Sequence, residues 1–478
     1  MQHLINRQTI HILLSKGADA FQMQQQMSGH YWRDILPTMA SVFDELSNNE
    51  EIIRIDRLEI DLGVLSEKDI NQSSWDGTIL EAIRKQLYEK IGGRKPNPWV
   101  IREPRAISAC RQWLFYMQKG YLPWNALEVN EGWYNVVLET LAVDYASVSE
   151  LIRMIKGEPV VSHRIVAQHK VDFLVKLFEI LTAQGQQDLP GIAEVLDKMF
   201  LQAKGSGLSG RGIMDGTQRI WVLLLREVAG SERQLSLQNL VERILRRYWS
   251  VDPNFHFPDK ENVLAHDIIL PVVDRLKKEA GQFTPPYNEI DSDEKVFVGD
   301  KKKETEKIEN IDQGIYLQNA GVVLLHPFLS SLFRRLYLVK EGKFENEQAQ
   351  QKALYLIHYM ATGQVLAEEY ELSIAKVLCA WPLEIPVDKS AKLSTDELTE
   401  TDAMLTAAIE QWSVLKNTSA TGLREGFLQR SGKLFTENEK LYLRVEAQSI
   451  DVLLDQLPWV LSMIKLPWMK ELLRVEWK

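Results

Sequence analysis

The most regular pattern of apolar positions lies in the last third of the chain. An apolar run, Val322–Leu325, ends at His326-Pro327. Proline disfavours helical geometry at the residue before it and fits the first turn of a new helix, so a helix is predicted to begin there. Apolar residues then recur every three or four positions from Phe328 to Tyr337, and Gly342 is the expected end of the helix. A second stripe of the same kind follows over residues 353–361, and the two stripes predict a helical hairpin.

The N-terminal part alternates between the two periods of regular secondary structure. Residues 3–14 alternate apolar and polar positions, as a half-buried strand does. Residues 23–46 repeat apolar positions at helical spacing, with Asp19 as the expected N-cap. Pro37 lies inside this helix and removes one of its hydrogen bonds, which predicts an interruption. Residues 51–63 alternate again with one change of phase, so a strand with a bulge is expected.

The middle of the chain, residues 71–286, is dominated by helical stripes. They occur over 79–91, 107–117, 136–142, 169–203, 217–229, 236–249 and 261–280. No fixed period links them, so no solenoid repeat is assigned. A Gly-rich segment near 205–216 is interpreted as a linker. Its Gly205, Gly207 and Gly210 match GxGxxG, but a dinucleotide site needs a strand before the glycines and here the preceding residues are helical.

A change of composition separates this middle region from the C-terminal part. Residues 287–312 carry many charges of both signs and few apolar residues, which is typical of a solvated linker. After them, strand alternation at 441–446 and 473–477 accompanies a short helix at 449–457. The predicted fold is mainly α with small mixed α/β elements at both ends: an N-terminal strand-helix-strand unit, a central helical array and a C-terminal α+β domain. The predicted segments are 1–70, 71–286, 287–312 and 313–478.

Composition narrows the classes of function. The net charge of −10 argues against a general binder of nucleic acids or anionic membranes, because both use clustered Lys and Arg. Two cysteines far apart, with no CxxC, indicate neither a disulfide framework nor a cysteine metal site, and they fit a reducing cytosol. The sequence contains no apolar run of about 18 or more residues that could span a bilayer, so membrane insertion is not predicted. No classical signal segment is found.

Candidate chemistry is sparse. Asp56, Glu59 and Asp61 lie on a predicted strand without a histidine at ligand spacing, so we interpret them as solvent-facing charges and not as a metal site. His326 and His358 would lie near each other if the two predicted helices paired, but a packed core histidine is the more common outcome. We therefore predict no catalytic, cofactor or metal site, and a protein that is not an enzyme.

Three tryptophans near the C-terminus are the candidate partner-docking residues. Trp459 and Trp468 each follow Leu-Pro, nine residues apart, and Trp477 closes the last predicted strand. Rings of this size bury a large area and usually belong to a core. The alternative is that they are exposed anchors for a protein partner.

Several sequence segments near both ends of the chain resemble the same protein family. They are RIDRLEIDLG at 54–63, NAGVVLLHPFL at 319–329, IHYMATG at 357–363, LREGFLQRSGKL at 423–434 and the closing LPWV, LPWM and LRVEW. Together they resemble the contractile injection system tape measure protein family of phage-tail-like particles. The resemblance implies a structural or assembly protein that governs inner-tube length and links the tube to the baseplate. Inner-tube, baseplate or cap subunits are then the expected partners.

Two interpretations of this resemblance stay open. Structured ends with a helical middle suit a ruler held at both termini, yet residues 70–312 as one continuous helix would span only about 365 Å. The prolines and glycines in the middle interrupt such a helix, and its stripes look wide enough to pack on each other. The alternative is a helical adaptor or chaperone that holds particle subunits during assembly. Both place the protein in the cytoplasm during assembly, and they leave open its oligomeric state and its presence in a released or cell-associated particle.

Overall fold

The structure is a computed structural model that divides into two compact units, Met1–Arg111 and Gln112–Lys478. It describes residues 3–5, 8–14, 19–65, 75, 77–92, 97–126, 129–130, 132–185, 188–202, 216–231, 236–251, 267–280, 314–389 and 392–477. The predicted linker over 287–312 and the GxGxxG glycines lie outside these described residues. The predicted division into four segments stays a prediction.

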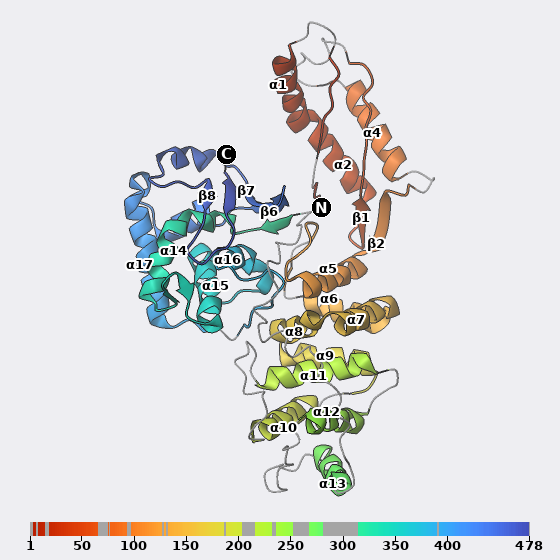
Figure 1. Ribbon diagram of the computed structural model, residues 1–478. Helices are drawn as coiled ribbons and strands as arrows, with labels where there is room; N and C mark the ends of the chain where they lie inside the picture. The colour runs from red at the N-terminus through yellow and green to blue at the C-terminus, as the bar shows by residue number, and fades with distance from the viewer. Residues whose placement is uncertain are drawn as a thin grey trace. The chain divides into compact units, whose positions relative to one another are not determined.

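The first unit packs helices beside a two-stranded sheet (Figure 1). Its elements are α1 (Ala20–His30), the π-helical turn η1 (Tyr31–Ile35), α2 (Leu36–Leu46), β1 (Glu51–Ile55), α4 (Gly77–Ile91) and β2 (Val100–Pro104). Helix α2 contacts α4, and β1 pairs antiparallel with β2 so that Glu51 faces Pro104. Val42 and Leu87 are fully buried between the helices. This unit therefore has an apolar core of its own.

The interruption predicted in the long helix is present. Asp19 caps α1, because its Oδ1 accepts hydrogen bonds from the backbone N–H of Phe21 and Gln22 at 3.0 and 3.1 Å. The turn η1 then separates α1 from α2, and Pro37 is the second residue of α2. Proline has no backbone N–H and its ring crowds the carbonyl four residues earlier, so a regular α-helical ladder cannot run through this position. The wider π turn accommodates the proline.

The strands predicted in this unit form only in part. Residues 8–14 belong to no strand, and β1 ends at Ile55, where the next residue, Asp56, donates its N–H to the carbonyl of Trp99 at 2.9 Å. Ile12 and Leu58 nevertheless pack against the core of the unit. Alternation of apolar residues thus predicts which side chains are buried. A hydrogen-bonded β-ladder also needs a neighbouring strand in register.

The second unit begins with a helical array, which we define as residues 112–280. Its helices are the second part of α5 (Arg105–Lys119), α6 (Trp133–Val143), α7 (Tyr145–Gly157), α8 (Pro159–Gln168), α9 (Val171–Thr182), α10 (Leu189–Gln202), α11 (Gly216–Gly230), α12 (Leu237–Val251) and α13 (Ile269–Ala280). They stack one on another, and α11 contacts each of α7, α8, α9, α10 and α12 (Figure 1). The helix predicted over 169–203 is in fact two helices, because Ala183 takes a left-handed conformation with φ 53° and ends α9.

The remaining residues, 314–477, form what we call the C-terminal region. Its helices are η3 (Ala320–Leu325), α14 (His326–Arg335), α15 (Glu347–Thr362), η4 (Glu369–Leu372), α16 (Ser373–Leu378), α17 (Thr395–Gln411), η5 (Ser413–Leu415), α18 (Ala420–Leu423), η6 (Arg424–Leu428) and η7 (Ser449–Gln456). Its strands are β3 (Ile315–Leu317), β4 (Val339–Lys340), β5 (Lys343–Phe344), β6 (Gly432–Glu437), β7 (Lys440–Val445), β8 (Met463–Ile464) and β9 (Leu473–Glu476). Five of these strands form one sheet in the order β3-β6-β7-β9-β8, in which only the β7–β9 pair is parallel.

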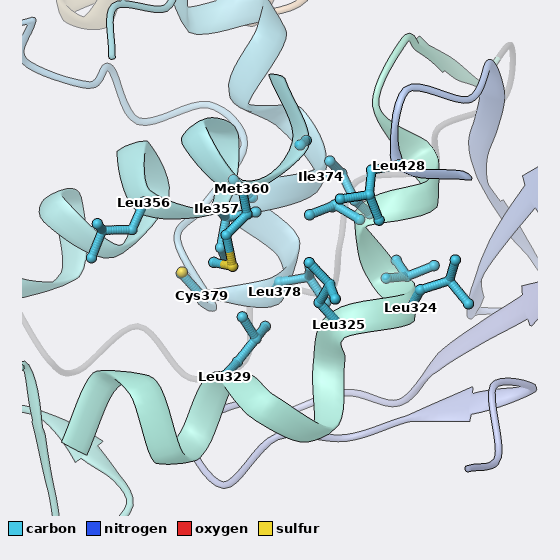
Figure 2. Close-up of a cluster of buried hydrophobic side chains, with 14 of the residues drawn as sticks. Leu324, Leu325, Leu329, Leu356, Ile357, Met360, Ile374, Leu378, Cys379 and Leu428 are labelled. Carbon is cyan, nitrogen blue, oxygen red and sulfur yellow. The ribbon is translucent and has the colours of Figure 1, made fainter. Parts of the chain in front are cut away.

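The core of the C-terminal region lies where η3, α14, α15, α16 and η6 meet (Figure 2). Leu329 of α14, Ile357 of α15 and Leu378 of α16 are fully buried there. Gly321 lets η3 approach η6, because a Cβ at this position would overlap the carbonyl oxygen of Phe427. The segment NAGVVLL therefore contains a tightly packed 3₁₀ helix.

The helix predicted to begin at His326-Pro327 does so, with the proline in its first turn. It ends at Arg335 and not at Gly342, because Tyr337 takes a left-handed conformation with φ 56°. A β-hairpin follows, whose turn residues Glu341 and Gly342 have φ 50° and 77°. This hairpin joins α14 to α15, and α14 lies against α17. Helix α15 ends before Gly363, which has φ 74°, as the sequence indicates.

The predicted fold class is confirmed, since the structure is mainly helical and its small sheets lie in the N-terminal unit and the C-terminal region. Strands β7 and β9 coincide with the two predicted ones, and η7 with the predicted short helix. None of the described helices combines the length and the apolar character that crossing a bilayer requires.

Candidate functional site

The three candidate docking tryptophans all direct their indole N–H groups into the C-terminal region. The indoles of Trp459, Trp468 and Trp477 donate to Leu324 O at 3.0 Å, to Leu378 O at 2.8 Å and to Asp451 Oδ2 at 3.1 Å. Trp477 is buried and the other two are half-buried. Each ring therefore supports the fold, and partner docking by these rings stays a prediction.

Trp477 also belongs to a buried polar cluster that holds the last strand. Arg430 is buried and its Nη2 donates to Asp451 Oδ1 at 2.7 Å, while its Nε donates to Gly426 O at 2.8 Å. Its guanidinium carbon lies 5.9 Å from the Trp477 ring centre, within range of a cation–π contact. The cluster fixes β9 to the segment that carries the LREGFLQRSGKL phrase.

The two histidines singled out from the sequence are placed by packing. His326 Nδ1 lies 3.0 Å from Val323 O, one turn earlier. His358 is buried on α15, and burial lowers its pKa to about 4, so it is neutral at pH 7. In the described residues neither imidazole is hydrogen-bonded to a carboxylate, which is the arrangement that general acid–base chemistry would use.

The acidic residues of the predicted N-terminal strand also have local partners. Asp56 pairs with Arg54 at 3.2 Å, and Glu59 pairs with Arg57. Asp61 Oδ1 accepts a hydrogen bond from the backbone N–H of Gly63, two residues later, at 2.9 Å. Within the described ranges no group of three or more His, Cys, Asp or Glu side chains is arranged to hold a metal ion.

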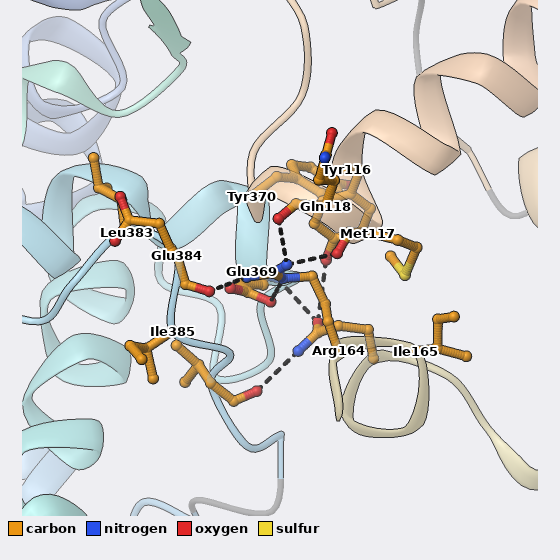
Figure 3. A network of polar contacts seen from close by, with 12 residues as sticks. Tyr116, Met117, Gln118, Arg164, Ile165, Glu369, Tyr370, Leu383, Glu384 and Ile385 are labelled. Atoms are coloured by element: carbon orange, nitrogen blue, oxygen red, sulfur yellow. Dashed lines mark hydrogen bonds and ion pairs between the residues drawn. The ribbon is translucent and has the colours of Figure 1, made fainter. Parts of the chain in front are cut away.

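The most unusual site is a buried charged network between the helical array and the C-terminal region (Figure 3). Arg164 of α8 donates through Nε to Glu369 Oε2 at 3.0 Å, and Lys376 of α16 donates to Glu369 Oε1 at 2.6 Å. All three side chains are at most 1% exposed. We call these three residues and their backbone acceptors the ionic seam. Charges this deeply buried are tolerated only when they are paired and fully hydrogen-bonded.

Arg164 uses its other donors on backbone carbonyls from both bodies. Its Nη1 donates to Met117 O at 2.6 Å and to Gln118 O at 3.0 Å, and its Nη2 donates to Glu384 O (Figure 3). Met117 and Gln118 belong to the last turn of α5, where carbonyls have no partner within the helix. Arg164 therefore caps α5 and contacts the C-terminal region with one side chain.

Lys376 has three acceptors, which match the three N–H donors of an ammonium group. They are Glu369 Oε1 at 2.6 Å, Leu383 O at 2.9 Å and Ile385 O at 2.8 Å. Burial lowers the pKa of Lys376 from its ordinary value, and the Glu369 carboxylate opposes that shift. The geometry fits the charged form.

A second ion pair lies beside the seam and is less buried. Lys389 Nζ lies 2.7 Å from Glu368 Oε2 and also donates to Gln168 O, at the C-terminal end of α8, at 2.8 Å. Tyr134 of α6 donates its hydroxyl to Glu368 Oε2 at 3.1 Å. Burial, with Glu368 nearby, raises the pKa of Tyr134, so its hydroxyl stays a donor. The array therefore meets a pair of adjacent glutamates, Glu368 and Glu369.

Gly120 closes the seam on the array side. Its φ of +80° is in the left-handed region, and a Cβ there would lie 2.8 Å from Glu369 Oε1 and 3.0 Å from Arg164 Nη2. Any other residue would be strained and would also press on the ion pair. The close approach of the two bodies thus depends on this glycine.

Sequence reasoning missed this site because its parts are remote from one another. Arg164 and Glu369 are separated by 205 positions, and no spacing or motif connects them. One signal was available: Lys376 stands inside the apolar run IAKVL, where an unpaired ammonium could not be buried. That signal predicts a buried anionic partner for Lys376, but it does not identify Glu369 or the array.

The chemistry of the seam is structural, since its donors and acceptors satisfy one another. In comparisons with known proteins, the family model described as contractile injection system tape measure protein matches residues 2–477. No curated protein and no solved structure matches the chain.

Proposed function

The chain belongs to the contractile injection system tape measure protein family, and we propose that it acts in particle assembly as a folded component that joins other subunits through its two ends. Membership makes it a structural component of a contractile injection system. The proposed docking ends are the N-terminal unit and the C-terminal region. Their expected partners are inner-tube, baseplate or cap subunits, met in the cytoplasm during assembly.

The packing of the helical array is the observation that supports a folded component over a stretched ruler. Helix α11 contacts five other helices of the array, so these helices lie side by side instead of end to end. Leu177, Leu196 and Leu225 are fully buried between them. Drawing residues 133–280 out as one helix would give a rod of about 220 Å. It would also expose these apolar faces to water, at about 25 cal/mol for each Å² exposed.

Tube length in assembled particles tests this proposal. A second copy of residues 288–310, inserted after the first, adds chain without altering any described element. We expect tubes of unchanged length, measured by electron microscopy. A ruler would instead lengthen every tube by about 35 Å if the insert is helical, or about 75 Å if it is extended.

A matched deletion gives the opposite change. Removing residues 237–280 takes away α12 and α13. A ruler would then shorten tubes by about 65 Å if that part is helical, whereas a folded docking component leaves tube length unchanged. Circular dichroism of the purified variant checks that the remaining helices still fold. Length changes that follow the added or removed residues in both variants would contradict the proposal.

A second candidate function is an adaptor or chaperone that holds subunits and leaves before the particle is complete. The separate apolar cores of the two units support the chaperone as well as the folded component. A protein that folds without its partners can bind subunits in solution. The two candidates differ in the finished particle. Quantitative mass spectrometry of purified particles should find the chain at a fixed ratio to baseplate subunits if it is a component, and should not find it if it is a chaperone.

A further inference from the structure

The C-terminal region has a hydrophobic core that it does not share with the helical array. All the buried apolar residues of this core lie between Ile315 and Trp477. Of the array side chains that the structure describes, Tyr121 alone packs against this core, and it is only half-buried. The array buries its own apolar faces, with Leu177 and Leu225 among them. The two bodies therefore share little apolar burial.

The contact between the two bodies is polar. It includes the Arg164–Glu369 ion pair and the hydrogen bond from Arg164 to Glu384 O. Lys389 and Gln168 donate to backbone carbonyls across the contact, the Glu369 N–H donates to Gln168 Oε1, and Tyr134 donates to Glu368. Aromatic contact adds one edge-to-face pair, Tyr116 with Tyr370, whose ring centres are 5.4 Å apart. Interfaces between bodies that move apart are polar in this way, whereas permanent ones resemble a core.

The partners of the buried charges are divided so that opening the contact isolates none of them. Glu369 and Lys376 both belong to the C-terminal region and stay paired at 2.6 Å, and Lys376 keeps the carbonyls of Leu383 and Ile385. Arg164 keeps the carbonyls of Met117 and Gln118 on the array. Breaking a buried pair is costly when it leaves a lone charge in an apolar site. Here the separated Arg164 and Glu369 would each meet water and retain a partner.

From this division we infer that the ionic seam is a separable joint. The C-terminal region can part from the helical array while both bodies stay folded, and closure of the joint needs the Arg164 charge and the space that Gly120 leaves. The inference does not rest on the proposed function. It would let one chain present its C-terminal region either fixed to the array or free of it, connected through residues 281–313.

The test uses the full chain. A protease recognition sequence, flanked by Gly and Ser, is added at one position within residues 288–310, and no residue is removed. After cleavage, the two fragments are sized at micromolar concentration by analytical ultracentrifugation. The otherwise unsubstituted chain should give fragments that sediment together. Arg164→Met should weaken their association roughly tenfold or more, the usual effect of removing one partner of a buried charged hydrogen bond. Gly120→Ala should weaken it too, although every charge is kept.

Two matched controls isolate the joint. Arg153→Met removes an arginine whose partner, Glu150, lies on the same exposed helix face. Gly363→Ala introduces the same left-handed strain at φ 74°, but its nearest neighbours are 3.6 Å away. Both control chains should keep their fragments associated after cleavage.

Thermal unfolding of the separated fragments completes the test. Each fragment should keep a cooperative transition of its own. Fragments that aggregate or lose cooperativity on separation would show a shared core and overturn the inference. It would also be overturned if fragments of the unsubstituted chain separate freely, or if Arg164→Met and Gly120→Ala both bind as tightly as the controls.

Discussion

The apolar core of the C-terminal region and the ionic seam hold parts of the same unit together by different means. In the core, side chains from η3, α14, α15, α16 and η6 bury one another (Figure 2). In the seam, three charges and several carbonyls satisfy one another (Figure 3). Apolar burial is non-directional and grows with area, whereas a buried ion pair gains little net stability once desolvation is counted. The core therefore provides the stability of the region, and the seam specifies how the region meets the array.

The largest expected effect comes from crowding the core backbone. Gly321→Ala places a methyl group on the Phe427 carbonyl, so η3 and η6 must move apart. We expect the free energy of unfolding of the C-terminal region to fall by more than about 3 kcal/mol. Chemical denaturation monitored by tryptophan fluorescence measures it. Gly426→Ala is the control, since its nearest neighbour would be a flexible Ile450 methyl at 3.8 Å, and an equal loss there would refute the explanation.

A cavity in the same core should have a slightly smaller effect. Leu329→Ala removes a fully buried side chain of α14 and should cost about 3 kcal/mol, within the usual 2–5 kcal/mol. Leu366→Ala, at a residue that is 80% exposed, should change stability by less than about 0.5 kcal/mol. Denaturant midpoints at constant slope measure both. Similar losses in the two variants would mean that the core does not dominate stability.

Acid should weaken both bodies through their buried histidines. Burial lowers the pKa of His358 in the core and of His163 in the array to about 4, and that of His169 in the array to about 3, below the ordinary 6.5. A depressed histidine pKa means that protonation favours the unfolded chain, so stability is complete above pH 6.5 and falls as pH decreases toward 4. Between pH 7 and pH 5 each histidine should contribute a loss of roughly 2 kcal/mol.

Substitution separates these two contributions. His358→Gln should reduce the pH dependence of unfolding in the C-terminal region and leave that of the array unchanged. His163→Gln should reduce it in the array, where His169 keeps its own contribution, and leave that of the C-terminal region unchanged. Hydrogen exchange at several pH values resolves the two bodies. A pH dependence that persists unchanged in both variants would assign it to other groups.

The smallest expected effect on the core comes from the seam. Arg164→Met removes the cap of α5 and should lower the stability of the array by about 1 kcal/mol. The C-terminal region should change by less than about 0.5 kcal/mol, because Glu369 keeps Lys376. Separate thermal transitions of the two bodies, resolved by calorimetry, measure this difference. A loss of several kcal/mol in the C-terminal region would place the seam among the supports of its core.

The sequence predicts features that have a local signal and misses those that do not. The start of α14 at His326-Pro327 and the end of α15 before Gly363 carry local signals, and both were predicted. The end of α14 was not, because Tyr337 directly after it takes φ 56° without being glycine. The break at Ala183 has the same cause, since nothing in an alanine indicates a left-handed residue.

Long-range features were harder still. Strand β6 (Gly432–Glu437) was not predicted, because its alternation is weak and its pairing with β3 and β7 comes from the folded sheet. The seam could not be predicted at all beyond Lys376, since Arg164 and Glu369 are 205 positions apart and only the folded structure brings them together. Local chemistry thus encodes the ends of helices, and remote charged contacts require the structure.

Native-state hydrogen exchange on the full chain tests the distinction between core and seam most directly. The amide of Ile357 in the core should exchange only when the C-terminal region unfolds. The amide of Glu369 donates across the seam to Gln168 Oε1 at 3.3 Å, so it should exchange at a clearly lower free energy. Arg164→Met should lower the second value and leave the first unchanged. If both amides exchange at one free energy and fall together in this variant, the array and the C-terminal region form a single cooperative body, and the distinction is wrong.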